Sequence, residues 1–218
     1  MVKKSQISKF RWVALAFGLT LVAIGGWRLL IIYNSAHKTT KLDNPTQAIT
    51  TSSDEPTEGP VVVASNYSVP ADQPFKIKIP QINAEGYIQK VGDDKFGKIA
   101  VPTNINMAGW YINSIKPGKT DGLSIIDGHV HGNYNPGIFI NLNKLSVGSE
   151  FVITYGDGQA YNFKIKSVQN VKYEDSANVL FTKDPNIASQ LNLVTCGGKY
   201  NESTKTYDKR VIVISEKI

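Results

Sequence analysis

Residues 191–198 read Leu191-Asn192-Leu193-Val194-Thr195-Cys196-Gly197-Gly198, a short apolar run that ends in the only cysteine of the chain and two glycines. Apolar and β-branched residues in alternation are typical of a half-buried β-strand. The glycine pair predicts that the strand stops there and leaves open space in front of the thiol. Since a lone cysteine is more often an inert apolar residue than a nucleophile, the rest of the chain has to decide its role.

The net charge of +6 is concentrated at the N-terminus. Five Lys and Arg residues and no acidic residue fall within residues 1–28, which leaves a net charge of +1 for the remainder. Such a distribution is typical of a membrane-topology signal and not of a nucleic-acid-binding surface. We therefore expect no nucleic-acid partner.

Residues 12–33 are apolar except for Thr20 and Arg28. At a helical rise of about 1.5 Å per residue they span about 33 Å, enough for a bilayer core of about 30 Å. The preceding basic residues predict a cytoplasmic tail at residues 1–11, a single-pass transmembrane signal anchor at residues 12–33, and an extracellular position for everything that follows. A cleaved signal peptide is the alternative, but the run is long and no clear cleavage site follows it.

Residues 34–73 differ in composition, because Ser, Thr, Asn, Asp, Pro and Glu dominate and the one apolar island is Val61-Val62-Val63. Such a segment cannot bury enough surface to fold alone, which predicts a flexible extracellular tether. A single cysteine cannot form an intramolecular disulfide, and an unpaired thiol outside the cell favours a reactive role.

Residues 74–218 carry β-patterns, with strict apolar–polar alternation in Phe75–Pro80 and in Phe163–Lys166. The glycines of 156–158 predict a hairpin turn, and the spacing in 138–145 suits a short helix. The predicted fold class is all-β with short helices, a closed or nearly closed antiparallel barrel of about eight strands. Its predicted strands are 75–80, 87–91, 98–101, 122–130, 150–155, 159–171, 191–196 and 210–215.

Histidine and arginine residues are placed to complete a nucleophilic site around Cys196. His129 and His131 lie at the end of the predicted strand 122–130, and an imidazole activates a thiol as base or as ion-pair partner. Arg210 begins the last strand, and antiparallel pairing would set it beside Cys196 with Cβ atoms about 4.5–5.5 Å apart. There its guanidinium would stabilise an oxyanion developing on a substrate.

At this point the chain resembles the sortases, membrane-anchored cysteine transpeptidases of bacterial surfaces whose nucleophile strand ends in T-L-x-T-C. Leu193, Thr195 and Cys196 match this pattern, whereas Asn192 replaces the first threonine. His129 and Arg210 match the family's catalytic histidine and arginine.

The sequence also indicates which class of sortase the chain resembles. The Leu-Val-Thr-Cys-Gly-Gly form and Ala108-Gly109-Trp110-Tyr111 look more like class F and E sortases than class A. No second membrane segment follows the domain, unlike in class C. No calcium requirement is expected, because residues 113–120 are basic with Lys116 and Lys119 where class A enzymes carry an acidic cluster.

The resemblance implies an eight-stranded sortase-type β-barrel at residues 74–218, in which Cys196 attacks the Thr–Gly bond of an LPxTG-like sorting signal. His129 would protonate the leaving amine and later deprotonate the incoming one, and Arg210 would hold the substrate and its oxyanion. The acyl group would pass to an amine of the peptidoglycan precursor or to water. The implied substrates are surface proteins with a C-terminal sorting signal, the implied location is the bacterial cell membrane, and no cofactor is implied.

The segment 172–190 matches the loop that forms one wall of the peptide groove in sortases. Val179, Leu180 and Phe181 are its candidate substrate-binding residues. Thr195, next to Cys196, is a further candidate substrate-binding residue. We expect its role to be packing or hydrogen bonding within the barrel near the site.

Three alternatives stay open. Asp127, His129 and His131 have metal-ligand types and would share one face of a strand, which suits a zinc hydrolase. We expect no metal, because no clear second cluster of ligands appears. His131 in place of His129 is the second alternative for the catalytic histidine. A non-enzymatic tethered surface β-domain with Cys196 merely buried is the third.

Overall fold

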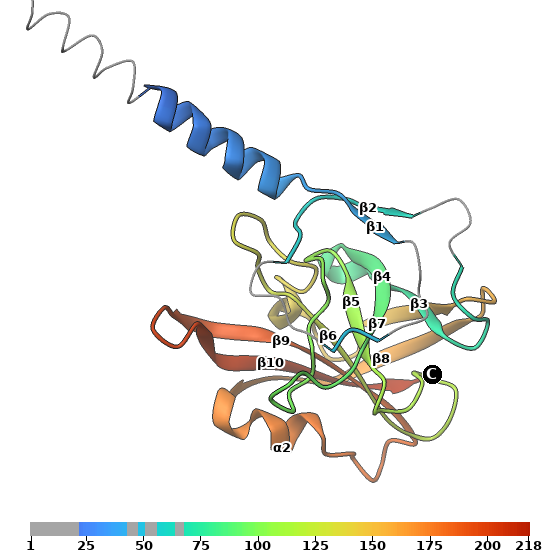
Figure 1. Cartoon of the computed structure of the whole chain (residues 1–218). Coiled ribbons are helices and arrows are strands. Elements are labelled where there is room, and N and C mark those ends of the chain that lie inside the picture. Colours follow the sequence, from blue (N-terminus) through green and yellow to red (C-terminus); the bar gives the residue numbers. More distant parts are fainter. Residues whose placement is uncertain (1–21, 43–47, 51–55, 64–67) are drawn as a thin grey trace, which may run out of the picture.

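The structure is a computed structural model that describes residues 22–42, 48–50, 56–63 and 68–218 (Figure 1). Eight strands form a closed barrel in the order β10-β8-β7-β3-β4-β5-β6-β9. The strands are β3 Pro74–Ile79, β4 Ala84–Val91, β5 Ala108–Tyr111, β6 Gly122–Gly128, β7 Glu150–Tyr155, β8 Ala160–Lys172, β9 Ser189–Asn201 and β10 Thr206–Lys217. Short helical elements in this part of the chain are η1 Pro80–Ile82, η2 Leu142–Lys144, η3 Tyr173–Asp175 and α2 Ser176–Leu180. The prediction of an eight-stranded, mostly-β barrel is confirmed.

The barrel is not purely antiparallel as predicted. β4 pairs with β5, and β6 with β9, in parallel, while the other pairs are antiparallel. Parallel neighbours need long crossover connections, which alternation within a strand does not reveal. The hairpin predicted at Gly156-Asp157-Gly158 is confirmed, since it joins β7 to β8.

Three local predictions differ from the structure in whole or in part. The segment 98–101 is not a strand and forms only an isolated bridge between Ile99 and Asp93, and the third strand of the barrel in chain order is instead β5 at residues 108–111. The short helix predicted in 138–145 is present as the three-residue η2, and residues 138–141 before it form turns. β9 does not stop at Gly197-Gly198 but continues to Asn201. Its pairing with β10 is kept across the glycines by a shift of register, of the β-bulge type, between Tyr207 and Lys209.

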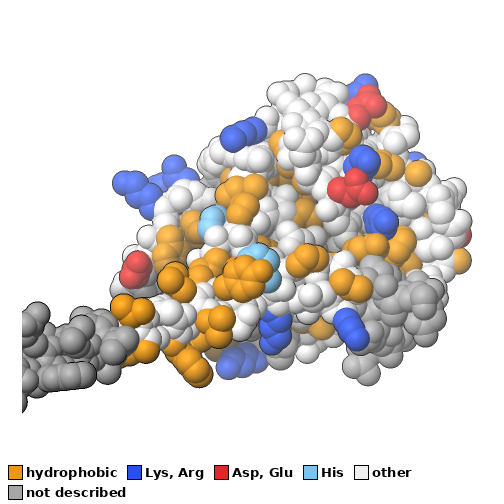
Figure 2. All heavy atoms as spheres, turned by 90° about the horizontal axis from the view of Figure 1, so that it is seen from above, with side chains coloured by type: hydrophobic (Ala, Val, Ile, Leu, Met, Phe, Trp, Pro, Cys, Tyr) orange, Lys and Arg blue, Asp and Glu red, His pale blue; other side chains and the backbone are white. Residues whose placement is uncertain are grey.

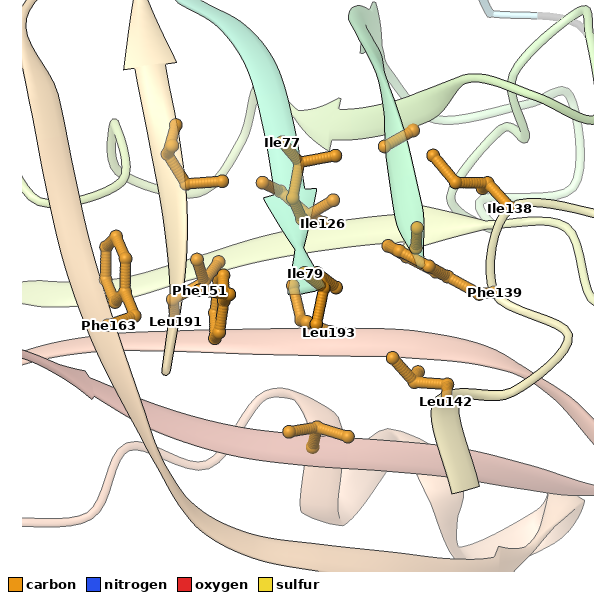
Figure 3. Packing of buried hydrophobic residues seen from close by; sticks show 14 of the residues in the cluster. Ile77, Ile79, Ile126, Ile138, Phe139, Leu142, Phe151, Phe163, Leu191 and Leu193 are labelled. Atoms are coloured by element: carbon orange, nitrogen blue, oxygen red, sulfur yellow. The ribbon is translucent and has the colours of Figure 1, made fainter. Parts of the chain in front are cut away.

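The barrel interior is an apolar core in which side chains from opposite strands meet (Figure 3). Ile77 and Ile79 of β3 and Leu191 and Leu193 of β9 all belong to this core and are fully buried. Each such side chain contributes about 1.5–3 kcal/mol when it leaves water. This core fixes which face of β9 points inward.

A second apolar cluster covers the outer face of the same strands. Ile125 of β6, Val194 of β9 and Ile212 of β10 pack there with Leu180 of α2. Figure 1 shows α2 lying along the outside of β9 and β10. Because both faces are covered, these three strands form a rigid platform, and the outward residues at its end are held in fixed positions.

Parts of the predicted tether 34–73 are attached to the barrel. β1 Thr40–Leu42 pairs in parallel with β2 Val61–Val63, and the Asn104 side chain donates hydrogen bonds to Thr40, Thr57 and Gly59. Residues 57 and 59 of the predicted tether thus contact the Asn104 side chain. A polar segment cannot build its own core, but it can satisfy its hydrogen-bonding groups on a barrel that already exists.

A helix over residues 22–36 extends away from the barrel (Figure 1). Within the described residues no helix is long and apolar enough to span a membrane. Residues 1–11 of the predicted cytoplasmic tail and residues 12–21 of the predicted anchor lie outside the described part of the chain.

Candidate active site

Strand register pairs two of the predicted catalytic residues, and the third follows directly after a strand that neighbours them. Cys196 on β9 lies opposite Arg210 on β10, which confirms the predicted pairing of these two positions. On the other side of β9, Asp127 of β6 pairs in parallel with Val194. His129 comes two residues after Asp127, directly past the end of β6 at Gly128, and Cys196 comes two residues after Val194 on β9. The imidazole therefore comes from the residue directly after β6, and the thiol and the guanidinium come from β9 and β10, at the same end of the barrel.

Thr195 lies behind these residues and not in front of them. Its buried hydroxyl donates a 2.7 Å hydrogen bond to the carbonyl oxygen of Gly128, the residue before His129. Neighbouring residues of a strand point to opposite faces, so Thr195 faces the interior when Cys196 faces out. Its contact ties the start of the histidine loop to the nucleophile strand.

The thiol of Cys196 is protonated at neutral pH. Burial raises the pKa of the Cys196 thiol, and the positive charge of Arg210 lowers it by less than burial raises it. The negative charge of Asp127 adds a smaller increase to the pKa of the thiol.

The imidazole of His129 is correspondingly neutral. Burial lowers the pKa of His129, while a hydrogen bond to the Pro102 carbonyl and the charge of Glu58 raise it. A carbonyl oxygen only accepts, so Nε2–H of His129 donates to Pro102 O at 2.8 Å. In the neutral ring this leaves Nδ1 as the proton acceptor. Neither Pro102 nor Glu58 carried a signal that sequence patterns reveal, because each acts through tertiary contact.

Arg210 is oriented by contacts that leave part of its guanidinium free to bind. Its Nη1 donates to the carbonyl oxygens of Lys209 at 2.9 Å and Tyr207 at 3.2 Å. The guanidinium carbon lies 4.6 Å from the centre of the Tyr173 ring in η3, within cation–π range. Tyr173 was not predicted, although an aromatic residue directly after the strand that pairs with Arg210 is a usable signal.

Of the three predicted groove residues, two pack against the barrel and one has an exposed aromatic ring. Leu180 is buried and Val179 half-buried in the outer apolar cluster, so both attach α2 to the barrel. Phe181 is half exposed and meets Tyr111 edge to face, with ring centroids 6.1 Å apart. Figure 2 shows histidine side chains at a surface where hydrophobic side chains gather. Substrate contact by the three residues stays a prediction.

Asn192, which departs from the T-L-x-T-C pattern, holds the groove loop in place. Its buried amide donates to the Leu180 carbonyl at 2.8 Å and accepts from Gln190 at 2.9 Å. Gln190 in turn accepts from the backbone N–H of Asp184 at 2.7 Å. The amide donates through its nitrogen and accepts through its oxygen, two atoms that lie apart, so this one side chain links the strand to the loop.

The metal-ligand pattern does not assemble. β6 ends at Gly128, after which the chain turns, so His131 is exposed and does not share a face with Asp127 as expected. His131 donates from Nδ1 to the Gly132 carbonyl. Among the residues that the structure describes, no group of three His, Cys, Asp or Glu side chains is placed to hold a metal ion.

Comparison with known proteins identifies the family. Residues 77–218 match the sortase domain. The fold is similar to sortase A from Corynebacterium diphtheriae in its lid mutant, with 24% identity, a TM-score of 0.52, and coverage of 70% of this chain and 73% of that chain. It is also similar to the Group B Streptococcus Pilus Island 1 sortase C2, with 18% identity, a TM-score of 0.50, and coverage of 69% and 76%. No curated protein matches the chain.

The half-buried Cys196 lies between Arg210 on one neighbouring strand and the end of β6, which His129 follows, on the other, in a closed β-barrel. The chain belongs to the sortase family, whose members are cysteine transpeptidases.

Proposed function

We propose that this protein is a membrane-anchored sortase that cleaves an LPxTG-like sorting signal between Thr and Gly and transfers the acyl group to an amine of the cell wall. The observation that carries the proposal is the pairing of Cys196 on β9 with Arg210 on β10, with His129 directly after β6, the other neighbour of β9. The apolar residues exposed along the helix 22–36, among them Trp27, Leu29 and Leu30, support the membrane anchor.

Acylation begins with a proton transfer from the Cys196 thiol to Nδ1 of His129, because the thiolate is the nucleophile. The sulfur then attacks the threonine carbonyl carbon and the carbonyl π electrons move to oxygen. Arg210 donates hydrogen bonds to that oxyanion. As the C–N bond breaks, the His129 imidazolium returns its proton to the leaving glycine amine, and a thioester on Cys196 remains.

Deacylation runs through the same groups in reverse. An incoming amine attacks the thioester carbonyl and His129 accepts one of its protons. The tetrahedral intermediate collapses, the C–S bond breaks, and the thiolate takes the proton back from His129. Water in place of the amine gives hydrolysis by the same steps.

The assignment to class F or E rests on the Leu-Val-Thr-Cys-Gly-Gly form and Ala108–Tyr111, and it stays part of the proposal, as does the cell-wall acceptor.

The test uses the full-length chain with a panel of LPxTG-like fluorogenic peptides and hydroxylamine as a small amine acceptor. We expect a peptide hydroxamate that ends at threonine, formed by the wild type and not by Cys196→Ala. His129→Gln and Arg210→Lys should each lower kcat/KM at least about 100-fold, as loss of a general base or oxyanion donor does. Cleavage that survives in Cys196→Ala would refute the proposal.

A further inference from the structure

A buried carboxylate from the segment before the barrel lies inside the loop that follows the histidine strand. Glu58 is 6% exposed. Its oxygens accept from the backbone N–H groups of Asn133 at 2.5 Å, Tyr134 at 3.1 Å and Asn135 at 2.8 Å. The Asn135 side chain donates a further bond at 3.0 Å. A buried charge is stable only when its hydrogen bonds are satisfied, and here one turn satisfies them.

That turn belongs to the loop that begins at His129. Phe139 N–H donates to the His129 carbonyl at 3.0 Å, and Gly137 N–H donates to Val130 at 3.0 Å. The two ends of the loop are therefore closed on each other next to the imidazole. A Cβ on Gly132 would lie 2.6 Å from the Glu58 carboxyl group, so the loop has a glycine where the carboxylate approaches most closely.

The same short segment also supports the second partner of His129. Thr57, the neighbour of Glu58, donates from its N–H to the Thr103 carbonyl at 2.9 Å and accepts from Ile105 N–H at 3.0 Å. These contacts fix the strand-like stretch that starts at Pro102, whose carbonyl accepts from Nε2 of His129. Residues 57 and 58 thus fix both sides of the imidazole: the loop that carries it and the acceptor that orients it.

We propose that Glu58 is a positioning residue for His129, so that the catalytic unit of this enzyme begins before the barrel, at residues 56–59. The inference rests on the function proposed above. It assigns the segment before the barrel a part in catalysis in addition to that of a spacer.

The charge of Glu58 gives the proposal a measurable signature. Its negative charge raises the pKa of His129 against the effect of burial. The ionisable groups on the neighbouring strands are Asp127 on β6, Cys196 on β9 and Arg210 on β10, and all three are kept when Glu58 is replaced. Loss of the carboxylate alone should therefore lower the pKa of His129.

The experiment compares Glu58→Gln with Glu85→Gln in the full-length chain. Glu85 is an exposed carboxylate paired with Lys78, so its variant removes an equal charge away from the site. The pKa of His129 is measured by NMR titration of its ring protons, assigned with a His129→Gln variant. We expect a lower pKa in Glu58→Gln only, together with a fall in kcat of about tenfold and a KM within about twofold of wild type, because a misplaced base affects chemistry more than binding.

Gly132→Ala is the second variant, for the case that Glu58→Gln does not fold. Its methyl group displaces the carboxylate from the loop side. It should lower the pKa of His129 and kcat in the same direction, and the double variant should be no worse than the more affected single one.

An unchanged His129 pKa in both variants would overturn the positioning role. The positioning role would also be overturned if the fall in kcat were fully explained by a smaller fraction of folded protein in the variant. The titration needs no peptide, so the positioning role can be judged even if no sorting signal is cleaved.

Discussion

At the scale of single residues, both reacting groups of the site rest uncharged at neutral pH. Burial raises the pKa of Cys196 and lowers that of His129, so the proton stays on sulfur. The reactive thiolate is a minor form below the pKa of the thiol. We therefore expect the thiol to react slowly with general electrophiles at neutral pH.

Alkylation of Cys196 tests this protonation state. The rate with iodoacetamide should be low at pH 7 and should still be rising at pH 9, because the pKa of the thiol lies above its ordinary value of 9.0. Arg210→Gln should move the rise to higher pH, since the guanidinium charge lowers the thiol pKa. A rate that is already constant at pH 7 would show that the resting site is an ion pair.

Asp127 is a buried acid two residues before His129, and its Oδ1 has no hydrogen-bond partner. Burial raises the pKa of the Asp127 carboxyl well above its ordinary value of 3.8. The folded state then binds more protons than the unfolded one. The free energy of unfolding therefore falls as the pH rises from about 3.8 through the folded-state pKa.

Asp127→Asn should remove this dependence. The variant cannot ionise, so its stability relative to wild type should grow as the pH rises and then level off, reaching about 1–3 kcal/mol. Urea unfolding at several pH values from 4 to 8 measures the difference, and Ser189→Ala, at the other buried polar atom without a partner, is the control. Parallel stability curves for wild type and Asp127→Asn would contradict the account.

At the scale of elements, β9 positions more than the nucleophile. On its outward face, Gln190 and Asn192 form hydrogen bonds to the groove loop, and Cys196 lies further along the same face at the candidate site. The same strand thus sets both the thiol and the wall beside it. This explains why Asn192 is accommodated in place of a threonine.

Asn192→Ala should release the groove loop. Loss of the amide leaves the Leu180 carbonyl without its donor and Gln190 without its acceptor, at a cost of about 1–3 kcal/mol. KM for the peptide should rise more than kcat falls, and hydrogen exchange in residues 180–184 should accelerate. Asn178→Ala, on the exposed side of α2, is the matched control and should change neither quantity. Equal effects in both variants would show that Asn192 does not hold the loop.

The strands that sequence could predict are those with strict alternation and hairpin connections. β3, β7, β8 and the site end of β9 with Arg210 opposite Cys196 follow from such local patterns. β5 could not be predicted, because it has four residues and pairs in parallel with β4. Its Gly109 lies across from Asp127, whose carboxyl group occupies the space that a Cβ would need.

At the scale of the whole molecule, the barrel and the segment before it act as one unit. The composition of residues 34–73 predicts no core, yet Thr57 and Glu58 bond to the barrel loops on both sides of His129. Hydrogen bonding of this kind has no periodicity in sequence, so it escapes pattern analysis. The pairing of Cys196 with Arg210 could be predicted because the chain has one cysteine and the loop after it returns as an antiparallel strand, whereas the catalytic roles of Cys196, His129 and Arg210 stay a prediction.

The central claim is that Cys196 forms an acyl-enzyme with a sorting-signal peptide. Intact-protein mass spectrometry of the full-length chain after incubation with LPxTG-like peptides measures this directly. The account predicts a mass increase equal to the peptide up to its threonine, located on Cys196, absent from Cys196→Ala and not trapped in Arg210→Ala. An unmodified Cys196 with every peptide, together with a thiol that no alkylating agent reaches in the folded protein, would contradict it.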